Sequence, residues 1–79
     1  MRAKTPKAVV TFATTSDAMA MEAAARTHGI PGRLIPVPSE IDAGCGLSWS
    51  AEASEREELL AAIAQHDIAH QGIYEVLMY

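Results

Sequence analysis

Hydrophobic and polar residues alternate with two different periods along the chain, and the alternation predicts four strands and two helices. Residues 7–13 are rich in β-branched and aromatic side chains and contain no Gly or Pro, which is typical of a buried central strand. Residues 33–37 also read as extended, but their prolines donate no hydrogen bond and favour the edge of a sheet. Residues 47–51 alternate as a half-buried strand does, with Trp49 as the expected core anchor, and residues 72–79 predict the last strand.

Capping residues mark the first helix. Hydroxyl side chains at residues 14–16 can accept hydrogen bonds from the first amides of a helix, and Asp17 adds a negative charge that favours the same end. The pattern predicts a helix over residues 17–28, and Gly29 followed by an apolar residue and a proline is a typical helix end. The residues expected on its core face are Ala18, Met21, Ala25 and His28.

A second helix is predicted over residues 54–65. Ser54 is followed three residues later by Glu57, which is the spacing of a capping box. The large apolar residues that follow recur at helical spacing and form one stripe. We therefore expect Leu59 and Ile63 to be buried against the sheet, and Glu55 and Glu58 to be exposed to solvent.

The predicted elements occur in the order β-α-β and then β-α-β, in two halves of similar length. This order predicts an α+β ferredoxin-like βαββαβ sandwich, with both helices on one face of a four-stranded antiparallel sheet. A chain of 79 residues can hold one core, so we expect a single domain over residues 1–79. Its core is expected over about residues 7–79, with a flexible N-terminus at residues 1–6.

Composition adds an expectation about assembly. Hydrophobic residues make up 49% of the chain, but 15 of them are Ala, so few large side chains are available for the core. The sheet face opposite the helices is also expected to be partly apolar. A thin core and an open apolar face favour a homo-oligomer, a dimer or larger.

Charge and cysteine content restrict the possible partners. Ten acidic and six basic residues give a net charge of -4, whereas proteins that bind nucleic acid usually carry a basic surface. This charge makes a nucleic acid partner unexpected. No apolar run approaches the ~20 residues that span a bilayer, so a membrane partner is not expected either. The single cysteine cannot form an internal disulfide, and small secreted domains usually contain several cysteines. These features predict a cytoplasmic protein.

The single cysteine, Cys45, is the residue on which chemistry can be based. Gly44 and Gly46 flank it, leave the sulfur approachable, and allow backbone amides to turn towards an anionic sulfur. This context favours a reactive thiol. The alternative is that Cys45 is a small buried apolar residue at the start of a strand, which is the commoner role of a lone cysteine.

Two other features of the sequence could contribute to a site. Arg33 would stabilise the Cys45 thiolate if the second predicted strand pairs with the third, or it is an exposed arginine of an edge strand. Residues 66–70 read His-Asp-Ile-Ala-His, which differs from the helical zinc signature by Asp in place of Glu, and no third ligand is evident. We therefore expect no bound metal.

Several short motifs together resemble a known family. They are a strand, a Ser/Thr-rich turn with Asp-Ala opening a helix, Gly-Ile-Pro, Arg-Leu-Ile-Pro-Val-Pro, a short acidic stretch, Cys-Gly-Leu, a helix, and Gly-Ile-Tyr-Glu. Over about residues 8–76, this pattern resembles the selenium/sulfur (Se/S) carrier protein-like family. By position, the resemblance assigns the family cysteine to Cys45, with Arg33 and Gly46 as the neighbouring matched positions. Trp49 departs from the smaller or aliphatic residue expected there.

The resemblance implies a carrier or handling protein for sulfur or selenium that forms a persulfide on Cys45. Persulfide transfer needs one accessible thiolate and no cofactor, and the chain has no second cysteine for dithiol chemistry. The implied partners are proteins of the sulfurtransferase or cysteine desulfurase type, so the chain is at most an accessory protein rather than a classical enzyme. The alternative is a non-catalytic interaction or regulatory module that oligomerises, with Cys45 structural.

Overall fold

The computed structural model describes residues 3–41 and 45–79. Within them, all predicted helices and strands are present, and their ends differ from the predicted ends by at most two residues. The first strand begins at Thr5, so Thr5 and Pro6 belong to the sheet instead of the flexible N-terminus that we expected. The elements are β1 (Thr5–Thr11), α1 (Thr15–His28), β2 (Arg33–Pro36), β3 (Leu47–Glu52), a short 3-10 helix η1 (Ala53–Glu55), α2 (Arg56–Gln65) and β4 (Gly72–Met78).

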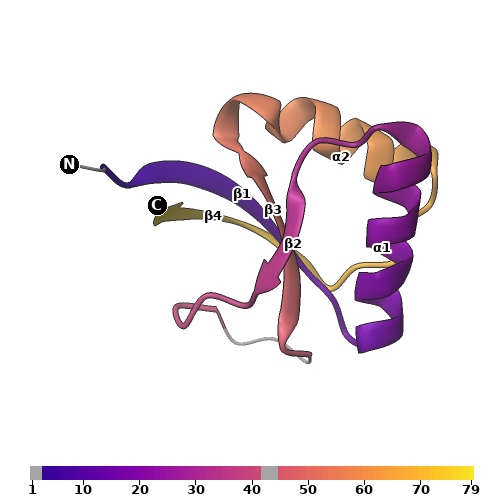
Figure 1. Ribbon diagram of the computed structural model, residues 1–79, viewed down its shortest axis with the longest axis horizontal. Helices are drawn as coiled ribbons and strands as arrows, with labels where there is room; N and C mark the ends of the chain where they lie inside the picture. Colours follow the sequence, from indigo (N-terminus) through magenta and orange to yellow (C-terminus); the bar gives the residue numbers. More distant parts are fainter. Residues whose placement is uncertain (1–2, 42–44) are drawn as a thin grey trace.

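The strands form one antiparallel sheet in the order β2-β3-β1-β4, and both helices cover the same face (Figure 1). This arrangement is the predicted α+β ferredoxin-like fold. β2 lies at one edge, as its prolines predicted, and β4 lies at the other edge. In the middle of the sheet Val10 lies opposite Trp49 and Ile73.

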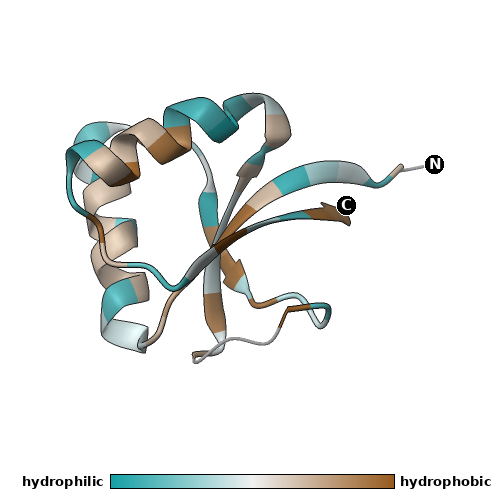
Figure 2. Ribbon diagram, turned by 180° about the vertical axis from the view of Figure 1, so that it is seen from behind, coloured by the Kyte–Doolittle hydropathy of each residue, from teal (hydrophilic) through white to brown (hydrophobic). Residues whose placement is uncertain are grey.

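The core lies between the sheet and the helices. Ala8 and Val10 of β1 point to this layer, and so does Phe12, which directly follows the strand. Alternate residues of a strand face the same side. Trp49 is 4% exposed and anchors the core as expected, and its indole Nε1 donates a hydrogen bond to the Pro31 carbonyl at 2.8 Å. Figure 2 shows hydrophobic residues where the strands cross at the centre of the sheet, and hydrophilic segments within both helices.

Local capping explains both ends of α1. The Thr14 hydroxyl accepts a hydrogen bond from the Asp17 amide at 3.1 Å, and Gly29 adopts the left-handed conformation with φ of 67°. Ala18, Met21 and Ala25 are buried as predicted, but the expectation for His28 was wrong. His28 is exposed because α1 ends there, and its ring stacks on His66 at the end of α2, with 3.8 Å between ring centroids.

The N-terminus of α2 differs from the prediction. β3 continues to Glu52, η1 follows it directly, and the Glu55 carboxylate accepts a hydrogen bond from the Glu52 amide at 3.1 Å. This contact replaces the predicted Ser54 and Glu57 capping box, and it makes Glu55 half-buried instead of exposed. The burial of Leu59 and Ile63 and the exposure of Glu58 are confirmed, because the helix keeps the predicted phase.

The sheet face away from the helices, called the open face here, is more buried than the alternation predicted. Val9 and Ser48 are 0% exposed, and Ser50 is 8% exposed. β3 lies between β1 and β2, so its serines have neighbours on both sides, and the Ser48 hydroxyl lies 3.4 Å from the Ile35 carbonyl. The expected half-buried strand is therefore a central strand with buried serines.

Candidate functional site

Cys45 lies at the end of the connection between β2 and β3, two residues before the first residue of β3. The Val37 amide donates a hydrogen bond to the Gly46 carbonyl at 3.0 Å, one position beyond the pair of Pro36 and Leu47 that ends the ladder. Prolines precede and follow Val37, so its amide is the only backbone donor of the Pro-Val-Pro segment. That single donor places the Pro-Val-Pro segment beside the residues around Cys45.

The sulfur of Cys45 is held by the backbone of Leu47. The Leu47 amide donates to Sγ at 3.4 Å, and the thiol donates to the Leu47 carbonyl at 3.3 Å. The side chain is half-buried, not disulfide-bonded, and packs against the hydrophobic core. One amide is therefore already directed at the sulfur, and it would go on donating to a sulfur anion, whereas the contact with the carbonyl requires the S–H proton.

The N-terminus of α1 lies at the same end of the sheet as Cys45. Thr11 at the end of β1 pairs with Ser48, three residues after Cys45, and Thr14 caps α1 three residues after Thr11. Figure 1 shows both the start of β3 and the start of α1 at this end. The unpaired amides of a helix N-terminus favour negative charge nearby, although Asp17 in the first turn offsets part of that effect.

Arg33 is not brought to Cys45. β2 and β3 do pair, but their register places Arg33 opposite Ser50, at the far end of the hairpin from the pair of Pro36 and Leu47. Arg33 also lines a pocket with Ser50 and Lys7, whereas Cys45 packs against the core. A direct contact between the guanidinium and the sulfur is therefore not formed.

Of the two glycines that flank Cys45, the structure describes only Gly46. Gly46 is exposed, and a Cβ placed on it would meet nothing within 4 Å, so the space around it is open as expected. The amide directed at the sulfur belongs to Leu47, which sequence reasoning did not single out. The only signal for it is its place two residues after the cysteine in the Cys-Gly-Leu motif. Gly44, the other flanking glycine, lies outside the described residues.

Neither histidine of the His66–His70 segment lies on a continuous helix. His66 caps α2, and Asp67 follows with φ of 51°, so the chain turns before His70. Across residues 3–41 and 45–79, no group of three or more His, Cys, Asp or Glu side chains could hold a metal ion. The helices in this part of the chain are too short or too polar to cross a membrane.

Comparison with known proteins supports the family assignment. The family model described as "Putative Se/S carrier protein-like" matches residues 7–75, which include most of β1, both helices, Cys45 and the first half of β4. Searches of curated proteins and of solved structures found no match.

Proposed function

Because the chain belongs to the Se/S carrier protein-like family, we propose that it carries sulfur or selenium on Cys45 as a persulfide or selenopersulfide. The observation that carries this proposal is the position of the thiol: it lies within the matched region, half-buried, with the Leu47 amide 3.4 Å from Sγ. A donor at this distance stabilises the anionic sulfur that both receives and releases the cargo.

The transfer step needs only the Cys45 thiolate of this chain and the persulfide of a donor protein. The Cys45 thiolate attacks the terminal sulfur of a donor persulfide, E–S–SH, and forms a new sulfur–sulfur bond. The donor bond breaks, the donor cysteine leaves as the thiolate E–S⁻, and Cys45 becomes a persulfide, so atoms and charge balance. Release to an acceptor thiolate is the same step in reverse. The selenium case replaces the terminal sulfur with selenium.

The chemistry also indicates the partners and the compartment. The donor must present a persulfide, so we propose proteins of the sulfurtransferase or cysteine desulfurase type. Between transfers the Cys45 thiol also has to remain unoxidised, which a reducing cytoplasm allows. No part of this step depends on a cofactor.

Intact-mass measurement tests the carrier. The folded chain is incubated with a cysteine desulfurase and cysteine, and we expect the mass to increase by one sulfur atom and to return after treatment with a reductant. Cys45→Ser should abolish the gain while changing the free energy of unfolding by less than about 1 kcal/mol. Ser39→Ala, in the same connection, is the matched control and should load as the parent does. An unloaded parent chain, or a loaded Cys45→Ser chain, would contradict the proposal.

A second function is favoured by one observation, which is that Cys45 packs against the hydrophobic core. A structural cysteine would suit a non-catalytic interaction module. A thiol reagent separates the two functions: the carrier requires labelling of Cys45 in the folded chain, whereas a structural cysteine is labelled only after denaturation. Unfolding of Cys45→Ser would likewise favour the structural role.

A further inference from the structure

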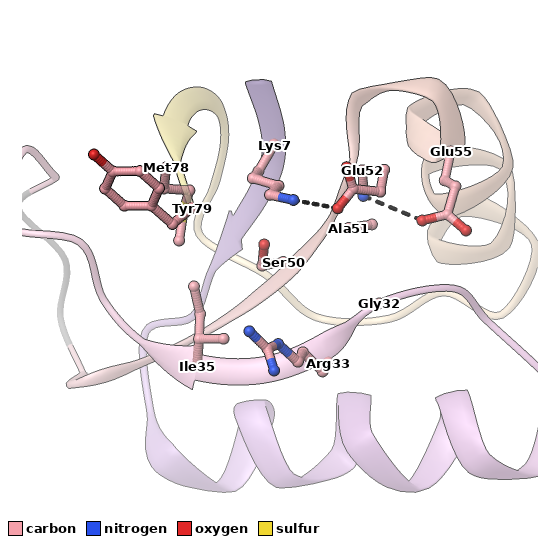
Figure 3. Close-up of a pocket in the computed structure, with 10 residues that line it drawn as sticks. All are labelled: Lys7, Gly32, Arg33, Ile35, Ser50, Ala51, Glu52, Glu55, Met78 and Tyr79. Atoms are coloured by element: carbon pink, nitrogen blue, oxygen red, sulfur yellow. Dashed lines mark hydrogen bonds and ion pairs between the residues drawn. The ribbon is translucent and has the colours of Figure 1, made fainter. Parts of the chain in front are cut away.

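The open face of the sheet contains a pocket of about 290 Å³ that is separate from Cys45 (Figure 3). It combines charged, hydroxyl and apolar side chains from every strand of the sheet. Its lining residues are Lys7, Gly32, Arg33, Ile35, Ser50, Ala51, Glu52, Glu55, Met78 and Tyr79.

Two hydrogen-bond donors in this pocket are not used by the fold. Arg33 and Ser50 are directly opposite each other on β2 and β3, so their side chains point to the same face. Figure 3 shows the Ser50 hydroxyl between the Arg33 guanidinium and the Lys7 side chain. Within the described residues, neither side chain has a hydrogen bond or an ion pair. A guanidinium beside a hydroxyl is a suitable receptor for a carboxylate.

Carboxylates lie at the other side of the pocket. Glu52 pairs with Lys7, its partner on β1, and the Glu55 carboxylate accepts a hydrogen bond from the Glu52 amide. The Lys7 side chain is 14% exposed, so this ion pair forms part of the pocket wall. The side chains of the lining therefore include two cations and two carboxylates.

Gly32 and the apolar residues set the shape. Gly32 has φ of 114°, and a Cβ there would lie 2.5 Å from the Ser50 carbonyl oxygen, so glycine lets β2 enter the sheet close to β3. This close approach positions the following residue, Arg33. Ile35 and Met78 supply apolar surface away from the carboxylates, as Figure 3 shows.

We propose that this pocket binds a free α-amino acid with an apolar side chain. The ligand carboxylate pairs with Arg33 and Ser50, its ammonium group faces the carboxylates, and its side chain lies against Ile35 and Met78. A zwitterion matches a lining whose side chains carry separated charges of both signs, since a simple anion or cation would meet two like charges. The volume of about 290 Å³ is just below the ~300 to 1,000 Å³ of sites for drug-sized ligands, which suits a ligand as small as one amino acid.

This site is independent of the proposed function. Cys45 packs against the core at one end of the β2–β3 hairpin, whereas Arg33 and Ser50 lie on the open face at the other end. Loss of amino acid binding would leave the persulfide experiment unaffected, and loss of persulfide loading would leave this site unaffected.

Three related small molecules test the charge requirement. L-leucine is titrated into the ¹⁵N-labelled chain and followed by amide chemical shifts, next to 4-methylpentanoate, which lacks the ammonium group, and 3-methylbutylamine, which lacks the carboxylate. We expect saturable shifts around Arg33, Ser50 and Glu55 with L-leucine, and affinities at least about tenfold weaker for both analogues. Absence of saturation with L-leucine, shifts centred on other residues, or equal binding of either analogue would overturn the proposal.

Two arginine variants test the receptor. Arg33→Gln should weaken L-leucine binding by at least about tenfold, because it removes a charged donor pair. Arg26→Gln removes the same charge from α1, where Arg26 pairs with Glu22, and should bind as the parent does. Ser50→Ala should weaken binding by a smaller factor, and the amide spectrum of each variant reports its fold. Unchanged binding by a folded Arg33→Gln chain, or equal weakening by Arg26→Gln, would overturn the proposal.

Discussion

Among the glycines that the structure describes, Gly32 has the least room for a side chain. Its φ of 114° is costly for any residue with a Cβ, and a Cβ there would lie 2.4 Å from the Trp49 Nε1 and 2.5 Å from the Ser50 carbonyl oxygen. The same close approach lets the Trp49 indole reach the Pro31 carbonyl. Backbone and core packing are therefore coupled at one position.

We predict that Gly32→Ala lowers the free energy of unfolding by at least about 2 kcal/mol, because left-handed strain and overpacking add. Gly46→Ala is the matched control, since nothing lies within 4 Å of its Cβ position and its φ is not positive. It should change stability by less than about 1 kcal/mol, through the unfolded chain. Urea unfolding measures both. Equal effects of the two substitutions would show that β2 does not approach β3 as closely as described.

At the scale of elements, α2 is too short to be stable alone. It has ten residues, whereas isolated helices shorter than about 12 residues are marginal in water, so its packing on the sheet must stabilise it. Leu59 and Ile63 are its buried residues, one turn apart on the same face. The start of the helix is held by the contact between Glu55 and the Glu52 amide.

Truncation of the buried stripe tests this packing. Ile63→Ala should cost about 2 to 5 kcal/mol, because it removes a side chain that is 5% exposed and leaves a cavity between α2 and the sheet. Glu57→Ala, at an exposed position of the same helix, should change stability by less than about 1 kcal/mol. Chemical denaturation of both variants is the measurement, and a cost below about 0.5 kcal/mol for Ile63→Ala would contradict the packing.

At the scale of the whole molecule, β4 is an edge strand with exposed hydrophobic residues at its end. It forms an edge of the sheet over seven residues, has no proline, and contains a single charged residue, Glu75. Leu77 is 60% exposed and Tyr79 is 57% exposed, and Figure 2 shows the end of β4 as hydrophobic. Natural edge strands of this kind are usually covered or paired.

We predict that two copies of the chain associate through antiparallel pairing of their β4 edges, which would join the two sheets. Leu77→Lys should shift the equilibrium to monomer, because an edge lysine opposes pairing. Met19→Lys, at a residue of α1 that is 47% exposed, is the control and should leave association unchanged. Sedimentation velocity across the micromolar range distinguishes these outcomes, and a monomeric parent chain throughout would contradict the prediction.

Much of the fold was predictable from local signals. The end of α1 at Gly29 and the edge position of β2 depend on the intrinsic preferences of glycine and proline, which act within a few residues. The phase of the apolar stripe on α2 is equally local, so the burial of Ile63 followed from spacing alone. At the site, the sequence singled out Cys45 because it is the only thiol of the chain.

The tertiary structure decided which residues meet. The register of β2 on β3 separates Arg33 from Cys45 and pairs it with Ser50, and the end of β3 at Glu52 determines where Glu55 bonds. His28 has the correct helical phase for burial, but α1 ends there and the ring meets His66 instead. Register and element length are set by packing between segments distant in the sequence, so local periodicity does not predict them.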